Sequence, residues 1–169
     1  MTIKNFQDGA YLYNDNGEMV CGPYHKLVQN GAYIKACIRE VINEKTDFEE
    51  TKYRWGLLDQ DGNEVLEIKY DFIEKFVDGF ARVKIGPFFG LINESAQFVI
   101  EPMYHDLGQM GEMGMYARAG SRYGVINIVN GKKEEVIPFK FKYMKNIDGK
   151  ITLFNDCVDS VQSESLDLT

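Results

Sequence analysis

The sequence predicts an all-β fold: an antiparallel meander of about four hairpin repeats of roughly 34 residues, stacked into an open curved sheet or solenoid. Three observations support this prediction. Gly56, Gly90 and Gly124 stand 34 residues apart, each directly after an aromatic residue. Apolar and polar residues alternate in short runs such as FARVKI and MYARAG, with Asp-Gly and Asn-Gly turn sites between runs. No segment shows a sustained apolar pattern at helical spacing.

Each unit is expected to repeat the same order of elements. After the glycine come an apolar run, a polar turn and a strand that ends on an aromatic residue, followed three residues later by an aliphatic one. These pairs are Tyr70 with Ile73, Tyr104 with Leu107, and Phe141 with Met144. A second glycine then opens another strand. Pro102 and Pro138 lie inside strand-like runs, so both are predicted at sheet edges or strand starts, where a missing N–H is tolerated.

The chain is expected to form one repeat domain over residues 1–169, because units of this size cannot bury a face alone and must stack on their neighbours. The units are placed at about 9–52, 53–87, 88–121 and 122–155, followed by an acidic tail at 156–169. The first unit lacks the Trp-Gly pair and carries an insertion at 38–52, in which IREVI extends a strand and NEKTDFEETK forms a charged loop. The degenerate first unit favours an open stack over closure into a small propeller.

The stretch YRWGLLDQDGNEVLEIKYDFIEKFVDGFARVK resembles the WG repeat, also called the KWG repeat, and FGLINESAQFVIEPMYHD and YGVINIVNGKKEEVIPFKFK are similar to it. The resemblance covers about residues 9–155. It implies a bacterial β-repeat module that mediates interactions, and it supplies no catalytic residues. Trp55 shares its place with Phe89 and Tyr123, so we interpret the aromatic residue as packing between units. The glycine after it is expected to permit a close backbone approach or a special dihedral angle.

Composition excludes several classes of partner. The net charge of −7 opposes a nucleic-acid partner, whose phosphates require clustered Lys and Arg. The N-terminus has no apolar signal region, and no run approaches the roughly 18 apolar residues of a membrane span, so we expect a cytoplasmic protein without a membrane partner. The three cysteines form no CxxC pair and are expected to be free thiols. No cofactor is predicted.

The candidates for chemistry are few, and we expect no enzymatic activity. His25 and His105 follow the aromatic residue of their units, in the place held elsewhere by Asp71 and Lys142. A position that accepts His, Asp and Lys is interpreted as a variable outward slot. No metal site is predicted, because an ion needs three or four convergent ligands. Nucleophile motifs are absent. Met110 and Met113, in GQMGEMG, are candidates for an adaptable contact surface.

A basic residue recurs after the second glycine of three units, at Lys35, Arg82 and Arg118, and Leu153 breaks the series. If these positions are equivalent, the three side chains form a ladder on one face. The ladder either binds a ligand or partner, or makes internal bridges to acidic residues of neighbouring units.

Three functional hypotheses follow. The leading one is a non-catalytic module that binds another protein. The second is a cytoplasmic immunity or inhibitor protein that neutralises a basic toxin or enzyme, since an acidic surface speeds association with a basic partner. The third is a small-ligand-binding protein that uses the Lys/Arg ladder. Exposed edge strands also make a homodimer a candidate assembly.

Overall fold

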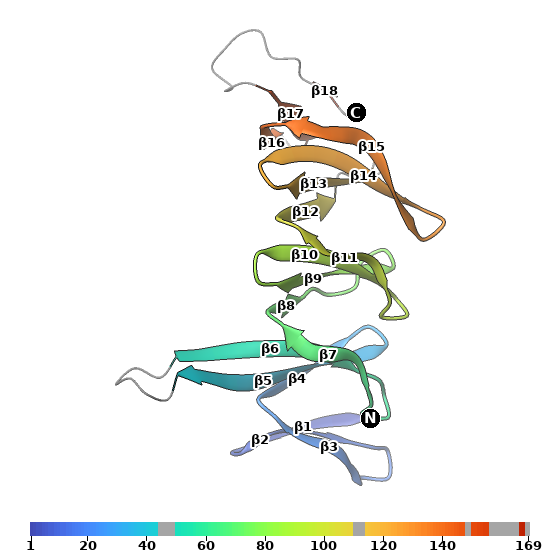
Figure 1. The fold of residues 1–169 in the computed structure, drawn as a ribbon. Helices are drawn as coiled ribbons and strands as arrows, with labels where there is room; N and C mark the ends of the chain where they lie inside the picture. The colour runs from blue at the N-terminus through green and yellow to red at the C-terminus, as the bar shows by residue number, and fades with distance from the viewer. Residues whose placement is uncertain (44–49, 110–113, 148–149, 156–165, 168–169) are drawn as a thin grey trace. The chain divides into compact units, whose positions relative to one another are not determined.

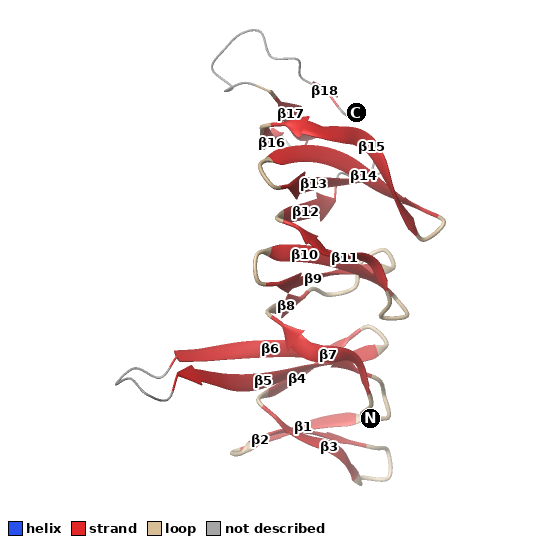
Figure 2. Ribbon diagram, viewed as in Figure 1, coloured by secondary structure: helices blue, strands red, loops and turns tan. Residues whose placement is uncertain are grey.

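A computed structural model describes residues 1–43, 50–109, 114–147, 150–155 and 166–167. Within these ranges the chain consists of strands joined by turns and bends, as Figure 2 shows, and it contains no helix. No helix of the described residues is therefore long and apolar enough to cross a membrane. The predicted all-β, antiparallel fold is confirmed.

The strands form five sheets in which neighbours in space are also neighbours in sequence (Figure 1), and no sheet of the described chain closes into a barrel. The first sheet contains β1 (Thr2–Phe6), β2 (Gly9–Tyr13) and β3 (Met19–Tyr24). The second contains β4 (Lys26–Asn30), β5 (Tyr33–Asn43), β6 (Glu50–Leu58) and β7 (Glu64–Tyr70). The third contains β8 (Phe72–Ile73), β9 (Phe80–Ile85), β10 (Phe88–Asn93) and β11 (Phe98–Tyr104). The fourth contains β12 (Asp106–Gln109), β13 (Met115–Ala119), β14 (Arg122–Val129) and β15 (Lys132–Phe141). The last contains β16 (Tyr143–Ile147), β17 (Lys150–Phe154) and β18 (Leu166–Asp167).

The chain folds as two compact units, one of Met1–Gly86 with Leu91–Phe98 and one of Pro87–Gly90 with Val99–Thr169. In the first unit, one apolar cluster joins the first two sheets through residues such as Leu12 and Ile34, and another joins β6–β7 to β8–β10. In the second unit, Val125, Phe141 and Leu153 form a cluster between β14–β15 and β17. Burial between successive sheets therefore supplies the core, because each sheet alone is too small to form one.

Four residues mark the points where the chain leaves one sheet and begins the next, and each makes the same main-chain hydrogen bond. Their N–H groups donate to a carbonyl two strands further on, over 2.8–2.9 Å. The pairs are His25 with Cys37, Asp71 with Lys84, His105 with Arg118, and Lys142 with Phe154. We call these four the corner residues. Because one bond recurs at all four corners, the chain contains four equivalent sheet junctions.

The aliphatic residue two positions after each corner points into the core. Leu27, Ile73 and Leu107 are buried, and the strand register places them opposite Ala36, Val83 and Ala117, respectively. Met144 stands opposite Leu153 in the same way. The two prolines behave as predicted: Pro102 lies in β11 and Pro138 in β15, and both strands are sheet edges.

The glycine of each aromatic–Gly pair is required by close packing of backbone on backbone. A Cβ at Gly56 would lie 2.6 Å from the carbonyl oxygen of Leu66, and one at Gly90 would lie 2.6 Å from that of Ile100. A Cβ at Gly124 would lie 2.7 Å from the Ile137 oxygen. None of the three has a positive φ. Of the two explanations that the sequence left open, close approach holds at all three glycines.

The insertion of the first unit lengthens one hairpin. β5 pairs with β4 only from Tyr33 to Cys37, and β7 pairs with β6 only from Trp55 onward. Among the described residues, Ile38–Asn43 and Glu50–Arg54 therefore pair with each other alone. We call these two segments the arm; it extends beyond the rest of its sheet in Figure 1. As expected, IREVI extends a strand, while residues 44–49 lie outside the described chain.

Candidate functional site

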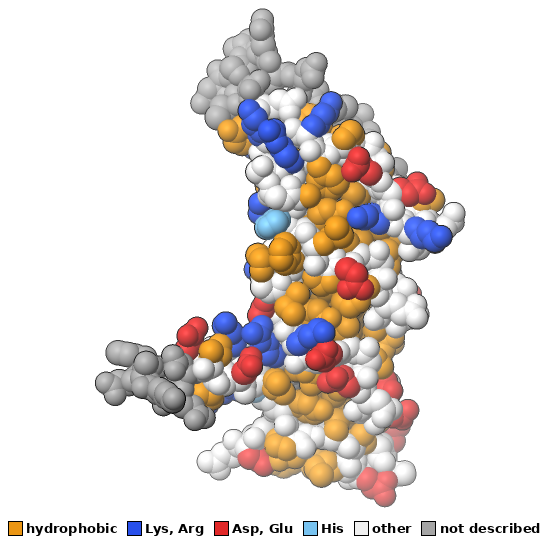
Figure 3. Space-filling model, in the orientation of Figure 1, with side chains coloured by type: hydrophobic (Ala, Val, Ile, Leu, Met, Phe, Trp, Pro, Cys, Tyr) orange, Lys and Arg blue, Asp and Glu red, His pale blue; other side chains and the backbone are white. Residues whose placement is uncertain are grey.

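An open groove of about 640 Å³ lies at the base of the arm. Its apolar lining comes from Ile38, Ile68 and Ile85. Four cationic side chains and two carboxylates complete it: Arg39, Lys52, Arg54, Lys69, Glu40 and Asp71. On a chain with a net charge of −7, this is a local excess of positive charge. Figure 3 shows Lys and Arg side chains gathered beside the base of the β5–β6 hairpin.

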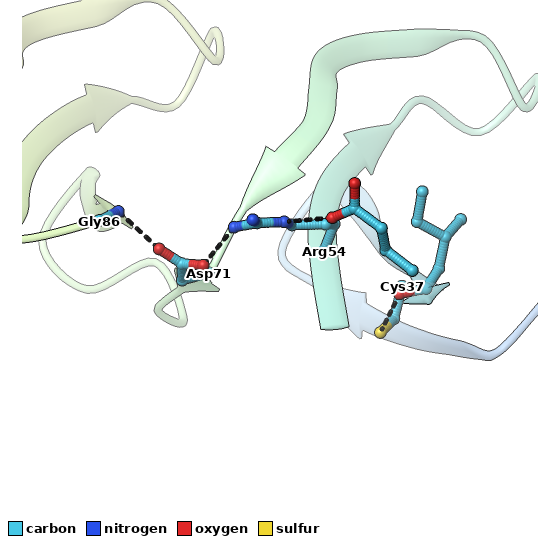
Figure 4. A network of polar contacts seen from close by, with 6 residues as sticks. Cys37, Arg54, Asp71 and Gly86 are labelled. Carbon is cyan, nitrogen blue, oxygen red and sulfur yellow. Dashed lines mark hydrogen bonds and ion pairs between the residues drawn. The ribbon is translucent and has the colours of Figure 1, made fainter. Parts of the chain in front are cut away.

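Arg54 organises the groove (Figure 4). Its Nε donates to Glu40 on the neighbouring strand over 3.0 Å, and its Nη1 forms an ion pair with Asp71. Asp71 in turn accepts a hydrogen bond from the N–H of Gly86 over 2.6 Å. The Glu40 side chain is half exposed, so that pair contributes about 0–1 kcal/mol. The network thus serves mainly to fix the orientation of Arg54 between the arm and the β9–β10 turn.

Two corner residues use their side chains to hold the next hairpin turn. The Asp71 carboxylate accepts from Gly86, and His105 Nδ1 accepts from the N–H of Gly120 over 3.2 Å. Both pairs are 15 residues apart, and both glycines have a positive φ, 56° and 59°. The interpretation of this position as a variable outward slot is therefore incomplete, because the side chain caps a turn in two of the four units.

The other two corners differ. His25 is exposed and packs on Tyr53 of the arm with ring centroids 4.7 Å apart. In this ring contact His25 resembles the turn-capping His105, whose ring centroid lies 4.9 Å from that of Phe88. Lys142 is exposed.

The strand register shows that the three ladder residues are not equivalent. Lys35 precedes Ala36, and Arg82 precedes Val83, whereas Arg118 follows Ala117. Ala36, Val83 and Ala117 occupy the same position opposite the buried aliphatic residue, so Arg118 lies two positions beyond the slot of Lys35 and Arg82. The residue in that slot of β13 is Tyr116. Leu153 does not break the series either, because it occupies the core position opposite Met144.

Lys35 reaches from β5 to the following sheet. Its Nζ donates to the carbonyl oxygen of Ile73 over 2.9 Å and lies 4.7 Å from the centre of the Trp55 ring. Burial lowers the pKa of Lys35 from its usual range, and repulsion from Lys26 lowers it further. The side chain thus exchanges hydration for a carbonyl and an aromatic face.

The two arginines also make internal contacts. Arg82 binds Glu74 through two nitrogens, at 2.7 and 2.5 Å, and both side chains are about one-third exposed. Arg118 donates to the carbonyl oxygens of Gly120 and His105, and its guanidinium lies 5.9 Å from the centre of the Tyr123 ring. Arg82 therefore bridges a carboxylate of its own hairpin, not one of a neighbouring unit.

Trp55 is half-buried and packs against the apolar cluster of β6–β10. Its indole ring lies beneath the ammonium group of Lys35, and the ring of Tyr123 lies beneath the guanidinium group of Arg118 in a similar way. A basic side chain over the aromatic residue of the aromatic–Gly pair is thus a feature of two units, and the sequence spacing did not show it.

The remaining candidates contribute little to this site. Met110 and Met113 lie outside the described residues, as does Cys157. Cys21 and Cys37 are free thiols whose pKa values are raised by burial. Within the described ranges, no group of three His, Cys, Asp or Glu residues is arranged to hold a metal ion.

Sequence reasoning missed the arm groove and the turn caps. The insertion was recognised, but Lys52 was assigned to a charged loop, although it lies on β6 opposite Glu40 of β5. The 15-residue spacing from Asp71 to Gly86 and from His105 to Gly120 was a signal for the caps.

Comparison with known proteins supports the repeat directly. A family model described as WG containing repeat matches the chain twice, over residues 55–86 and 89–118. Comparisons with curated proteins and with solved structures found no match. The two matched segments contain the close-packed Gly56 and Gly90 and the corner residues Asp71 and His105. The chain therefore contains WG repeats, over residues 55–86 and 89–118.

Proposed function

We propose that this β-repeat module is non-catalytic and binds another protein, and that the arm of β5 and β6 is where it does so. The observation that carries the proposal is the exposure of the arm. Ile38, Val41, Ile42 and Tyr53 are 37–46% exposed on a hairpin segment whose described residues pair only with each other. A two-stranded hairpin is marginally stable in water, and apolar side chains exposed on both of its faces favour cover by a partner.

The contacts within the repeat support the arm as the binding site. The groups that are chemically most versatile in the repeat take part in internal contacts: His105 caps a turn, Arg82 binds Glu74, and Lys35 binds the Ile73 carbonyl. The aromatic–Gly pairs are used for close packing. The arm departs from the repeat, and it presents both apolar and charged side chains to solvent. We therefore assign the architecture to the repeat and propose the insertion as the binding region.

The test uses a variant in which Asn-Gly replaces residues 39–53, so that Ile38 and Arg54, which face each other in the register, flank a two-residue turn. Wild type and variant are immobilised and exposed to lysate of the native organism, and a captured protein is then purified and titrated against both. We expect the wild type to bind it saturably and the variant to bind at least tenfold more weakly. Equal affinity for both proteins, or no captured protein at all, would refute the proposal.

A further inference from the structure

The arm has an open edge beside the cationic groove, and strand register defines which groups face it. The carbonyl of Cys37 accepts from His25 on the β4 side of β5. Its partner Trp55 therefore directs its own main-chain groups away from β5, toward β7. Residues two and four positions earlier, Tyr53 and Thr51, direct theirs to the same side, because main-chain direction alternates along a strand.

Nothing in the described chain pairs with β6 at that edge. β7 contacts β6 at Trp55, Leu57 and Leu58, and it ends at Tyr70 opposite Trp55. Beyond this point the edge of β6 continues along Arg54–Glu50, in line with the end of β7. A strand laid there would extend the ladder where β7 leaves it.

The two faces of the arm differ in chemistry. Ile38, Glu40, Lys52 and Arg54 lie on the groove face, because the register pairs Ile38 with Arg54 and Glu40 with Lys52. Tyr53, with 46% of its surface exposed, lies on the opposite face with Val41 and with its register partner Arg39. A strand beside β6 would thus meet Lys52 and Arg54, together with Glu40, on one face, and Tyr53 and Val41, together with Arg39, on the other.

Of the cations that line the groove, Arg39 donates to the Thr51 hydroxyl over 3.5 Å, and Lys52 has no ion pair among the described residues. Arg54 is engaged with Glu40 and Asp71, and Lys69 lies 2.6 Å from Glu67. Lys52 is exposed on the groove face. Its ammonium group has a carboxylate opposite it on β5, Glu40, but that carboxylate binds Arg54. A carboxylate on an added strand, placed beside Lys52, would supply the ammonium group with an ion-pair partner.

We infer that the arm binds its protein partner by strand addition: an extended segment with acidic and aliphatic residues in alternation pairs with the outer edge of β6. The main-chain N–H and C=O groups of Thr51 and Tyr53 form hydrogen bonds with the added strand. Carboxylates of the segment face Lys52 and the groove, and its aliphatic side chains cover Tyr53. This inference rests on the proposed function, and it adds the mode of binding and the chemistry of the partner segment.

The experiment uses a synthetic acetylated peptide of nine residues, alternating Glu and Val, titrated into the full chain labelled with ¹⁵N. Two comparison peptides replace Glu by Lys or carry N-methyl groups throughout. We expect saturable binding of the Glu/Val peptide, with slower amide exchange at Thr51 and Tyr53, and at least tenfold weaker binding of both comparison peptides. Failure of the Glu/Val peptide to saturate below about 1 mM would overturn the inference.

The matched variants are Lys52→Glu, in the groove, and Lys75→Glu, at an exposed position outside it. We expect Lys52→Glu to lower the affinity for the Glu/Val peptide at least tenfold and to raise the affinity for the Lys/Val peptide. Lys75→Glu should change neither affinity by more than about twofold, because screened charges act over about 10 Å. Equal effects of both substitutions would overturn the inference. If the captured partner still requires the arm but the peptide does not bind, strand addition is wrong and the proposed function stands. If the partner binds the arm-shortened variant equally well, the proposed function itself fails.

Discussion

Gly56→Ala tests whether the aromatic–Gly pair is an architectural feature. The new methyl group would lie 2.6 Å from the Leu66 oxygen and 2.8 Å from the Ile68 Cα, whereas ordinary contacts begin near 3.4 Å. The backbone of β7 must therefore move by about 0.8 Å, which disturbs the bulged pairing of β6 with β7. Overpacking costs about 1–3 kcal/mol, and each weakened main-chain hydrogen bond adds about 1 kcal/mol. We expect a loss of about 3 kcal/mol in the free energy of unfolding.

The assay is urea unfolding, followed by the fluorescence of Trp55, the only tryptophan, which lies in the same compact unit. Gly17→Ala is the matched control. Gly17 has a φ of 80°, but no atom lies within 4 Å of its added Cβ, so only the dihedral cost of about 1 kcal/mol applies. If Gly56→Ala is no more destabilising than Gly17→Ala, the close-approach explanation is wrong.

Two further predictions concern the repeat. Trp55→Ala should lower the free energy of unfolding by about 2 kcal/mol, less than for a fully buried aromatic, because the ring is half-buried; Trp55→Phe, which copies Phe89, should cost about 1 kcal/mol. Both variants lack the tryptophan, so their unfolding in urea is followed by circular dichroism; similar stabilities would contradict the packing role. Hydrogen bonds from the Asn63 side chain and then its backbone lower the pKa of Asp59 from its ordinary 3.8, so its stabilising effect is present above pH 3.8 and is lost as the pH falls through the lower value. Asp59→Asn should therefore be less stable than wild type at pH 7, and the difference should vanish in acid; a difference that persists at low pH would refute this assignment.

The period of the repeat was predictable, but its phase was not. Gly56, Gly90 and Gly124 fixed a step of 34 residues because each glycine meets a neighbouring backbone. A period does not show where one sheet ends, and the structure places the junctions at the corner residues, inside the sequence units. Main-chain hydrogen bonds define those junctions, and a main-chain bond leaves no direct trace in side-chain identity.

The prediction that Lys35, Arg82 and Arg118 form a ladder was wrong for a related reason. The three residues were aligned by their distance from the second glycine of each unit. The distance from that glycine to the core position is not constant, however. It is five residues from Gly31 to Ala36, four from Gly79 to Val83 and three from Gly114 to Ala117. Hairpin pairing sets the register, so residues at equal distance from a glycine need not share a slot. The groove was missed because Lys52, Arg54 and Asp71 become neighbours only when β6 and the corner after β7 are placed together.

The central claim is that one sheet junction is built four times. Amide hydrogen exchange at His25, Asp71, His105 and Lys142 tests it most directly, because each N–H donates to the equivalent carbonyl two strands on. We expect all four amides to exchange much more slowly than those of an unstructured chain, although His25 and Lys142 have exposed side chains. An unprotected amide at any of the four corners would contradict the claim that the units are equivalent.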